Sequence, residues 1–96
     1  MTTELAKSTI FIPTALRGFA GGNASYDVSA GTVGQALAQL TAEYPDLKKH
    51  LFNDEGKLRS FVNLYLGEDD IRYLDGEDTA LAANSELTIV PSIAGG

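Results

Sequence analysis

The sequence predicts an α+β fold in which a mixed sheet of four to five strands carries one main helix on one face. Three observations predict it: a strand pair comes first, an amphipathic helix follows at 33–44, and short strand-like segments fill the rest of the chain. Ninety-six residues suffice for one core. We therefore expect a single domain over 1–90, with a loose leader at 1–7 and a flexible tail at 91–96.

The first two strands form a predicted hairpin. In the segment 8–13 the two isoleucines share one face and Phe11 lies on the other, which is the alternation of a strand. The segment 24–29 is the second strand. The glycine-rich stretch 17–23 is expected to be the flexible turn between them.

The helix has a capping signature. Thr32 is a good N-cap, and Gln35 follows three residues later, so the two make a capping box. Pro45 ends the helix because it disfavours the helical conformation of the residue before it. A short second helical turn is expected at 47–52. The apolar residues that recur at three- and four-residue spacing on one side of the main helix are Val33, Ala36, Leu37, Leu40 and Tyr44.

The second half of the chain supplies the remaining strands. The segment 61–66 alternates strictly, and the set that contains Asn63 is expected to face away from the core. A turn at 67–70 leads to a short strand at 71–74, and the last strand lies at 87–90. The end strands can then lie side by side in the middle of the sheet, an arrangement called a β-grasp. The expected core is Ile10, Ile12, Val28, Val33, Leu37, Leu40, Val62, Leu64, Ile71, Leu81, Leu87 and Ile89.

Composition excludes several classes of partner. Thirteen acidic and seven basic residues give a net charge of −6, and only Lys48 and Lys49 are adjacent cations, so we expect no nucleic acid partner. No apolar run approaches the roughly 20 residues that span a bilayer. No secretory signal is visible, so the expected location is the cytoplasm.

The residues offer little chemistry for catalysis. The chain has no cysteine, which excludes disulfides, thiolate metal sites and a cysteine nucleophile. His50 is the single histidine and cannot hold a metal alone; its place beside two lysines is typical of a surface residue. A Ser-His-Asp triad is formally possible, but the sequence has no Gly-x-Ser-x-Gly elbow that would hold its serine. We expect no enzyme activity, no metal and no bound cofactor.

The last six residues carry the functional signal. Pro91 cannot donate to a sheet ladder, so it is expected to release the chain from the last strand. The tail that follows ends in Ile93, Ala94, Gly95 and Gly96. A glycine has no β-carbon and can enter a channel too narrow for other residues. The Gly96 carboxylate is therefore a group that can be carried into another enzyme while the folded body stays outside.

Four segments are similar to a known family: IPTALR at 12–17, FVNLY at 61–65, EDDIRY at 68–73 and IVPSIAGG at 89–96. From Ile10 to Gly96 the chain resembles the ThiS/MoaD group of ubiquitin-like sulfur carriers. Its length and the run GKLRSFVN at 56–63 resemble the longer members. These include the carrier of phosphoserine-dependent cysteine synthesis.

The resemblance implies a mechanism. An E1-like enzyme adenylates the Gly96 carboxylate with ATP, and a sulfur donor displaces AMP to leave a thiocarboxylate. The thiocarboxylate donates its sulfur to an accepting enzyme, either cysteine synthase-like or the large subunit of molybdopterin synthase. ATP then belongs to the partner. Two alternatives stay open: a small subunit of molybdopterin synthase, and a modifier conjugated to lysines.

Partners need a docking surface. Phe11, Phe61 and Tyr65 are expected on the sheet face opposite the helix, with Val90 beside the tail. The alternative is that the segment 44–56 or a loop covers some of them. An acidic group is either a solvated turn surface or a contact for a basic partner; it consists of Glu68, Asp69, Asp70, Asp75, Glu77 and Asp78.

Overall fold

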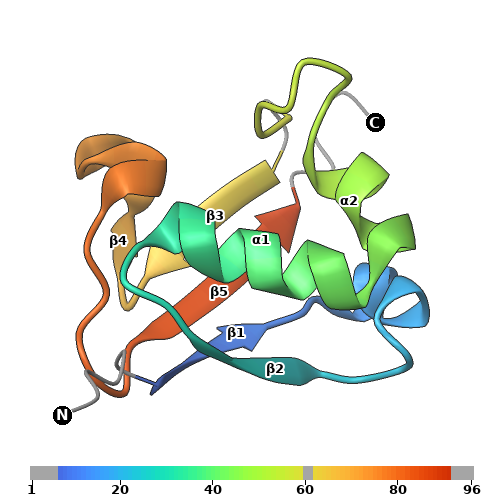
Figure 1. The fold of residues 1–96 in the computed structure, drawn as a ribbon, viewed down its shortest axis with the longest axis horizontal. Helices are drawn as coiled ribbons and strands as arrows, with labels where there is room; N and C mark the ends of the chain where they lie inside the picture. The colour runs from blue at the N-terminus through green and yellow to red at the C-terminus, as the bar shows by residue number, and fades with distance from the viewer. Residues whose placement is uncertain (1–6, 60–61, 92–96) are drawn as a thin grey trace, which may run out of the picture.

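A computed structural model describes residues 7–59 and 62–91 of the chain. Five strands form one sheet in the order β2-β1-β5-β3-β4, and Figure 1 shows α1 lying across one face of it. The α+β β-grasp class is confirmed. The elements in chain order are β1 Lys7–Phe11, 3-10 helix η1 Thr14–Phe19, β2 Ser25–Ser29, α1 Val33–Glu43, α2 Pro45–Leu51, β3 Val62–Leu66, β4 Asp69–Asp70, 3-10 helices η2 Ile71–Tyr73 and η3 Gly76–Asp78, and β5 Glu86–Pro91.

The first and last strands lie side by side in the middle of the sheet. β1 pairs antiparallel with β2 and parallel with β5, where Ile10 lies opposite Leu87. On its other side β5 pairs antiparallel with β3, and Leu64 lies opposite Ile89. The predicted arrangement of the end strands is therefore confirmed.

The cap and the apolar stripe of α1 are both present. Thr32 Oγ1 accepts a hydrogen bond of 3.2 Å from the Gln35 N–H. Gln35 Oε1 in turn accepts from the Gly31 N–H at 2.9 Å, one residue earlier than in a standard capping box. All of the predicted stripe is buried except Tyr44, which is half-buried. The helix ends at Glu43, and its C-cap, Tyr44, directly precedes Pro45, which opens α2.

Every residue of the predicted core is buried. The prediction left out Leu47 and Leu51, two fully buried side chains of α2. This helix has seven residues, and so short a segment does not show a helical period by itself. Its burial follows from packing on α1 and η1, which the sequence pattern does not contain.

Gly34 has a packing role in the first turn of α1. Glycine costs a helix about 1 kcal/mol relative to alanine. A β-carbon at this position would lie 3.2 Å from the backbone oxygen of Glu77 in η3. Glycine therefore allows α1 and η3 to approach closely.

Two predicted elements are wrong. The turn expected at 17–23 is partly helical, because η1 begins at Thr14 and the Leu16 N–H donates to the Pro13 carbonyl at 2.9 Å. The strand expected at 71–74 is instead η2. Gly67 has a φ of +64° and turns the chain so sharply that the short return strand, β4, already lies at 69–70.

β5 runs one residue further than expected, since Pro91 still lies opposite Val62. The Gly67 N–H donates to the Glu86 carbonyl at 2.9 Å, which marks a hydrogen-bonded pair at the start of β5. Such pairs alternate along antiparallel strands, so Pro91 takes a position that needs no donor toward β3. Pro91 itself is therefore still part of β5, and the predicted release of the chain lies outside the described residues. Phe61, the expected first residue of β3, lies outside the described residues.

We predict that Thr32→Ala lowers the free energy of unfolding by about 1 kcal/mol, because it removes the side-chain acceptor at the start of α1. Urea unfolding followed by circular dichroism measures the loss. The control is Thr32→Ser, which keeps the hydroxyl and should recover most of the stability. Equal losses in the two variants would show that the cap contributes nothing.

Candidate functional site

The tail predicted to act lies beyond the described residues. Ile93, Ala94, Gly95 and Gly96 are not described, and their roles stay predictions. The structure does describe the strand that carries them. β5 is held between β1 and β3, and it ends at Pro91. Anything attached to Pro91 therefore starts from a fixed point in the centre of the sheet.

The sheet face opposite α1 carries a row of side chains. Phe11 of β1 lies opposite Thr88 of β5, and Thr88 lies opposite Tyr65 of β3. Side chains alternate along a strand, and the neighbours Ile10 and Leu87 are buried in the core on the α1 side. The row therefore lies on the outer face, as predicted.

Three of the four predicted docking residues share this outer face. Val90 lies on it two residues beyond Thr88, and the exposed fractions of Phe11 and Val90 are 39% and 40%. Tyr65 is half-buried. Phe61 lies outside the described residues. We call Phe11, Tyr65 and Val90 the sheet-face patch.

The segment 44–56 does not cover this patch. Its helix, α2, packs against α1 and η1, on the opposite layer of the molecule. Two further hydrophobic side chains extend the patch instead. Tyr73 and Leu74 line a hollow together with Tyr65, and their exposed fractions are 88% and 41%. Sequence reasoning missed them because it placed both in a strand, where alternation would have separated them.

A polar cluster borders the patch. The Arg72 guanidinium lies 3.2 Å from Asp70 Oδ2 and donates to Asn63 Oδ1 as well. Asn63 is the Cα partner of Val90. The two contacts hold the Arg72 side chain beside the last residues of β5, although it is 58% exposed.

Asp70 is the one carboxyl of the acidic group that this cluster engages. The Arg72 backbone N–H donates to it at 2.9 Å and holds the pKa of the Asp70 carboxyl below its usual value. Burial opposes that shift in pKa, while the guanidinium adds to it. The other five carboxylates of the group are exposed, on β4, on η3 and on the turns before them, which agrees with a solvated surface. Their contact with a basic partner stays a prediction.

The remaining candidates are His50 and groups of metal-ligating side chains. His50 is half-buried and stacks on Phe19 with ring centroids 4.0 Å apart. Across residues 7–59 and 62–91, no three metal-ligating side chains come together. Within the same residues, no helix has the length and apolarity to cross a membrane.

The chain belongs to the ThiS family, whose model matches residues 10–96. It is 39% identical over 90 residues to the sulfur carrier protein CysO of Mycobacterium tuberculosis, an alignment that covers 92% of this chain and 97% of that protein. The crystal structure of that CysO superposes with a TM-score of 0.81 over 90% of this chain and 99% of the other, at 36% identity.

Two other relatives bear on partners and on alternatives. The chain is similar to a chain in the crystal structure of the Amycolatopsis orientalis BexX/CysO complex, with a TM-score of 0.83 and 32% identity over 93% of this chain and 99% of that chain. It is also 37% identical over 65 residues to small archaeal modifier protein 3 of Haloferax volcanii, covering 68% of this chain and 70% of that protein.

We predict that Asp70→Asn reduces the loss of stability in acid. The pKa of the folded Asp70 lies below the ordinary value of about 3.9, so its stabilising effect is complete above that value and disappears as the pH falls through the folded-state pKa. Urea midpoints of the wild type and the variant should therefore converge from pH 6 to pH 2. A constant difference between them would contradict the assignment.

Proposed function

We propose that the protein is a sulfur carrier whose C-terminal Gly96 carboxylate is adenylated by an E1-like enzyme and converted to a thiocarboxylate. One observation carries the proposal: the sequence is 39% identical to CysO over 92% of the chain, and the tail follows the central strand of the fold. Sulfur donation in cysteine synthesis is the role that this similarity favours. The chain is then the substrate of enzymes and has no active site of its own.

The chemistry needs only a terminal carboxylate from this chain. A carboxylate oxygen of Gly96 attacks the α-phosphorus of ATP, and pyrophosphate leaves. Sulfide then attacks the acyl carbon, and AMP leaves with the electrons of the broken C–O bond. The product is a thiocarboxylate, whose sulfur is the nucleophile toward the acceptor. Because the chain has no cysteine, no thiol of its own attacks the adenylate.

The folded body supports this chemistry by holding the start of the tail in a fixed position. β5 is paired on both sides as far as Thr88 and with β3 as far as Pro91. The root of the tail is therefore fixed, and the body stays outside the partner while the small residues of the tail enter. The sheet-face patch ends at Val90, directly before that root. We assign the patch to docking on the activating enzyme and on the sulfur-accepting enzyme.

A second candidate function is conjugation to proteins. The similarity to small archaeal modifier protein 3 favours it, because a modifier uses the same adenylated C-terminus. The two functions differ in the group that attacks the acyl carbon. A sulfur donor gives a thiocarboxylate, whereas a lysine amine gives an isopeptide bond.

Deletion of Gly96 tests the proposal. We expect the shortened protein to unfold at the same urea concentration as the wild type, because the described core ends at β5. It should fail to support AMP formation by the E1-like enzyme encoded in the same genome. AMP formation at the wild-type rate would contradict the proposal.

Two phenylalanines of equal exposure test the docking face. Phe11 on the sheet-face patch is 39% exposed and Phe19 on η1 is 38% exposed. Phe11→Asp should weaken binding to the activating enzyme roughly tenfold, about 1.4 kcal/mol, because it places a charge in the contact. Phe19→Asp is the matched control and should bind as the wild type does. Equal binding of both variants, measured by calorimetry, would point to a different surface.

A further inference from the structure

A second recessed surface lies at the outer edge of β3, apart from the sheet-face patch. It has a volume of about 420 Å³. The buried side chains of Val62, Leu64 and Ile71 are at its base, and Lys57, Arg59 and Arg72 surround it. We call it the edge pocket. It combines an apolar interior with a cationic border.

The border of the pocket carries several cationic residues, although the chain as a whole is acidic. The chain has a net charge of −6, yet three of its seven cationic residues line this one pocket. Asp70 and Glu77 also reach it, and Asp70 is already engaged by Arg72 at 3.2 Å. Among the described residues, neither Lys57 nor Arg59 has a carboxylate within ion-pair distance.

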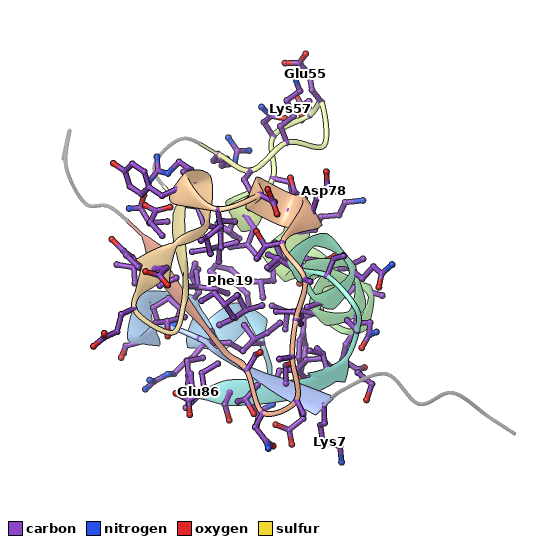
Figure 2. The ribbon with its side chains drawn as sticks, turned by 90° about the vertical axis from the view of Figure 1, so that its left-hand side faces the viewer. Lys7, Phe19, Glu55, Lys57, Asp78 and Glu86 are labelled. Atoms are coloured by element: carbon purple, nitrogen blue, oxygen red, sulfur yellow. The ribbon has the colours of Figure 1, made fainter. Side chains whose placement is uncertain are left out.

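Lys57 and Arg59, the two cations of the pocket without an ion-pair partner among the described residues, differ in their surroundings. Arg59 Nε donates to the Lys49 carbonyl at 2.9 Å, which orients the guanidinium and leaves its terminal nitrogens available to an acceptor. Lys57 lies on the loop before β3, and Figure 2 shows it projecting from one end of the molecule, with Lys7 at the other end. The pocket thus offers one oriented and one exposed cation beside an apolar base.

The pocket adjoins the root of the tail. Val62 at its base is the Cα partner of Pro91, the last described residue of β5. A ligand in the pocket therefore sits next to the point from which the tail leaves. The sheet-face patch reaches the same point through Val90, so the two surfaces flank the root from different sides.

We propose that the edge pocket receives an acidic segment of the activating enzyme, in which one aliphatic or aromatic side chain occupies the apolar base and flanking carboxylates pair with Lys57 and Arg59. The inference rests on the proposed function, because it assigns a contact of the same enzyme. The apolar base favours a peptide over a bare phosphate, which has no group to fill it. Charge pairs at the border fix the orientation in which the tail is presented.

Charge reversal in the pocket tests the contact. Lys57→Glu should weaken binding to the activating enzyme of the same genome about tenfold and make binding less sensitive to salt. Lys7→Glu changes the net charge equally at the opposite end of the molecule and should bind within about twofold of the wild type. Equal affinities of the two variants, with normal activation of the wild type, would overturn the proposal. A wild type that is not activated at all would instead overturn the proposed function.

Peptide titrations test the pocket without the enzyme. Acetyl-Glu-Leu-Glu-amide, added to the isotopically labelled protein at millimolar concentration, should shift the amide resonances of Leu58 and Ile71. The matched peptide acetyl-Lys-Leu-Lys-amide should not. No shift, or equal shifts with both peptides, would overturn the proposal. If deletion of residues 92–96 alone shifts both resonances, the occupant is the protein's own tail, which also overturns it.

Discussion

The parallel pairing of β1 with β5 is the contact on which the rest of the structure depends. It joins Ile10 to Leu87, two fully buried residues from opposite ends of the sequence. A slip of one residue in this register would turn Leu87 and Ile89 toward solvent and Val90 toward α1. The core and the sheet-face patch would then be lost together. Correct pairing therefore decides both the stability of the fold and the surface that is proposed for docking.

In the proposed function, the same pairing separates the folded core from the part of the chain that acts. The core under α1 is buried, and the strand that carries the C-terminus is paired with a neighbouring strand on both sides. On the outer face, about two fifths of the surface of Phe11 and of Val90 is exposed. Burying this apolar surface against a partner would contribute favourable hydrophobic free energy to binding. In the proposed function, recognition and chemistry share one strand: Val90 near its end belongs to the sheet-face patch, and the residues beyond it carry the carboxylate.

Periodicity was enough to predict the core, because strands alternate by two and α1 repeats at three and four residues. It failed where a contact between distant segments decides the outcome. The helix η2 replaces a strand because Asp70 caps the Arg72 N–H, and Leu47 is buried because α2 packs on α1. The Arg72–Asn63 contact and the edge pocket likewise arise only when β3 and η2 meet. The roles of Gly95 and Gly96 were inferred from the sequence and stay predictions.

The central claim is that the Gly96 carboxylate is converted to a thiocarboxylate. The intact mass of the protein tests this claim most directly. The protein would be incubated with the E1-like enzyme, ATP and a sulfide donor, and then measured by mass spectrometry. The expected result is a mass increase equal to the replacement of one oxygen by one sulfur, located in the C-terminal peptide and absent when ATP is omitted. An unchanged mass after confirmed AMP release, or a gain found only as lysine-linked adducts, would contradict the claim.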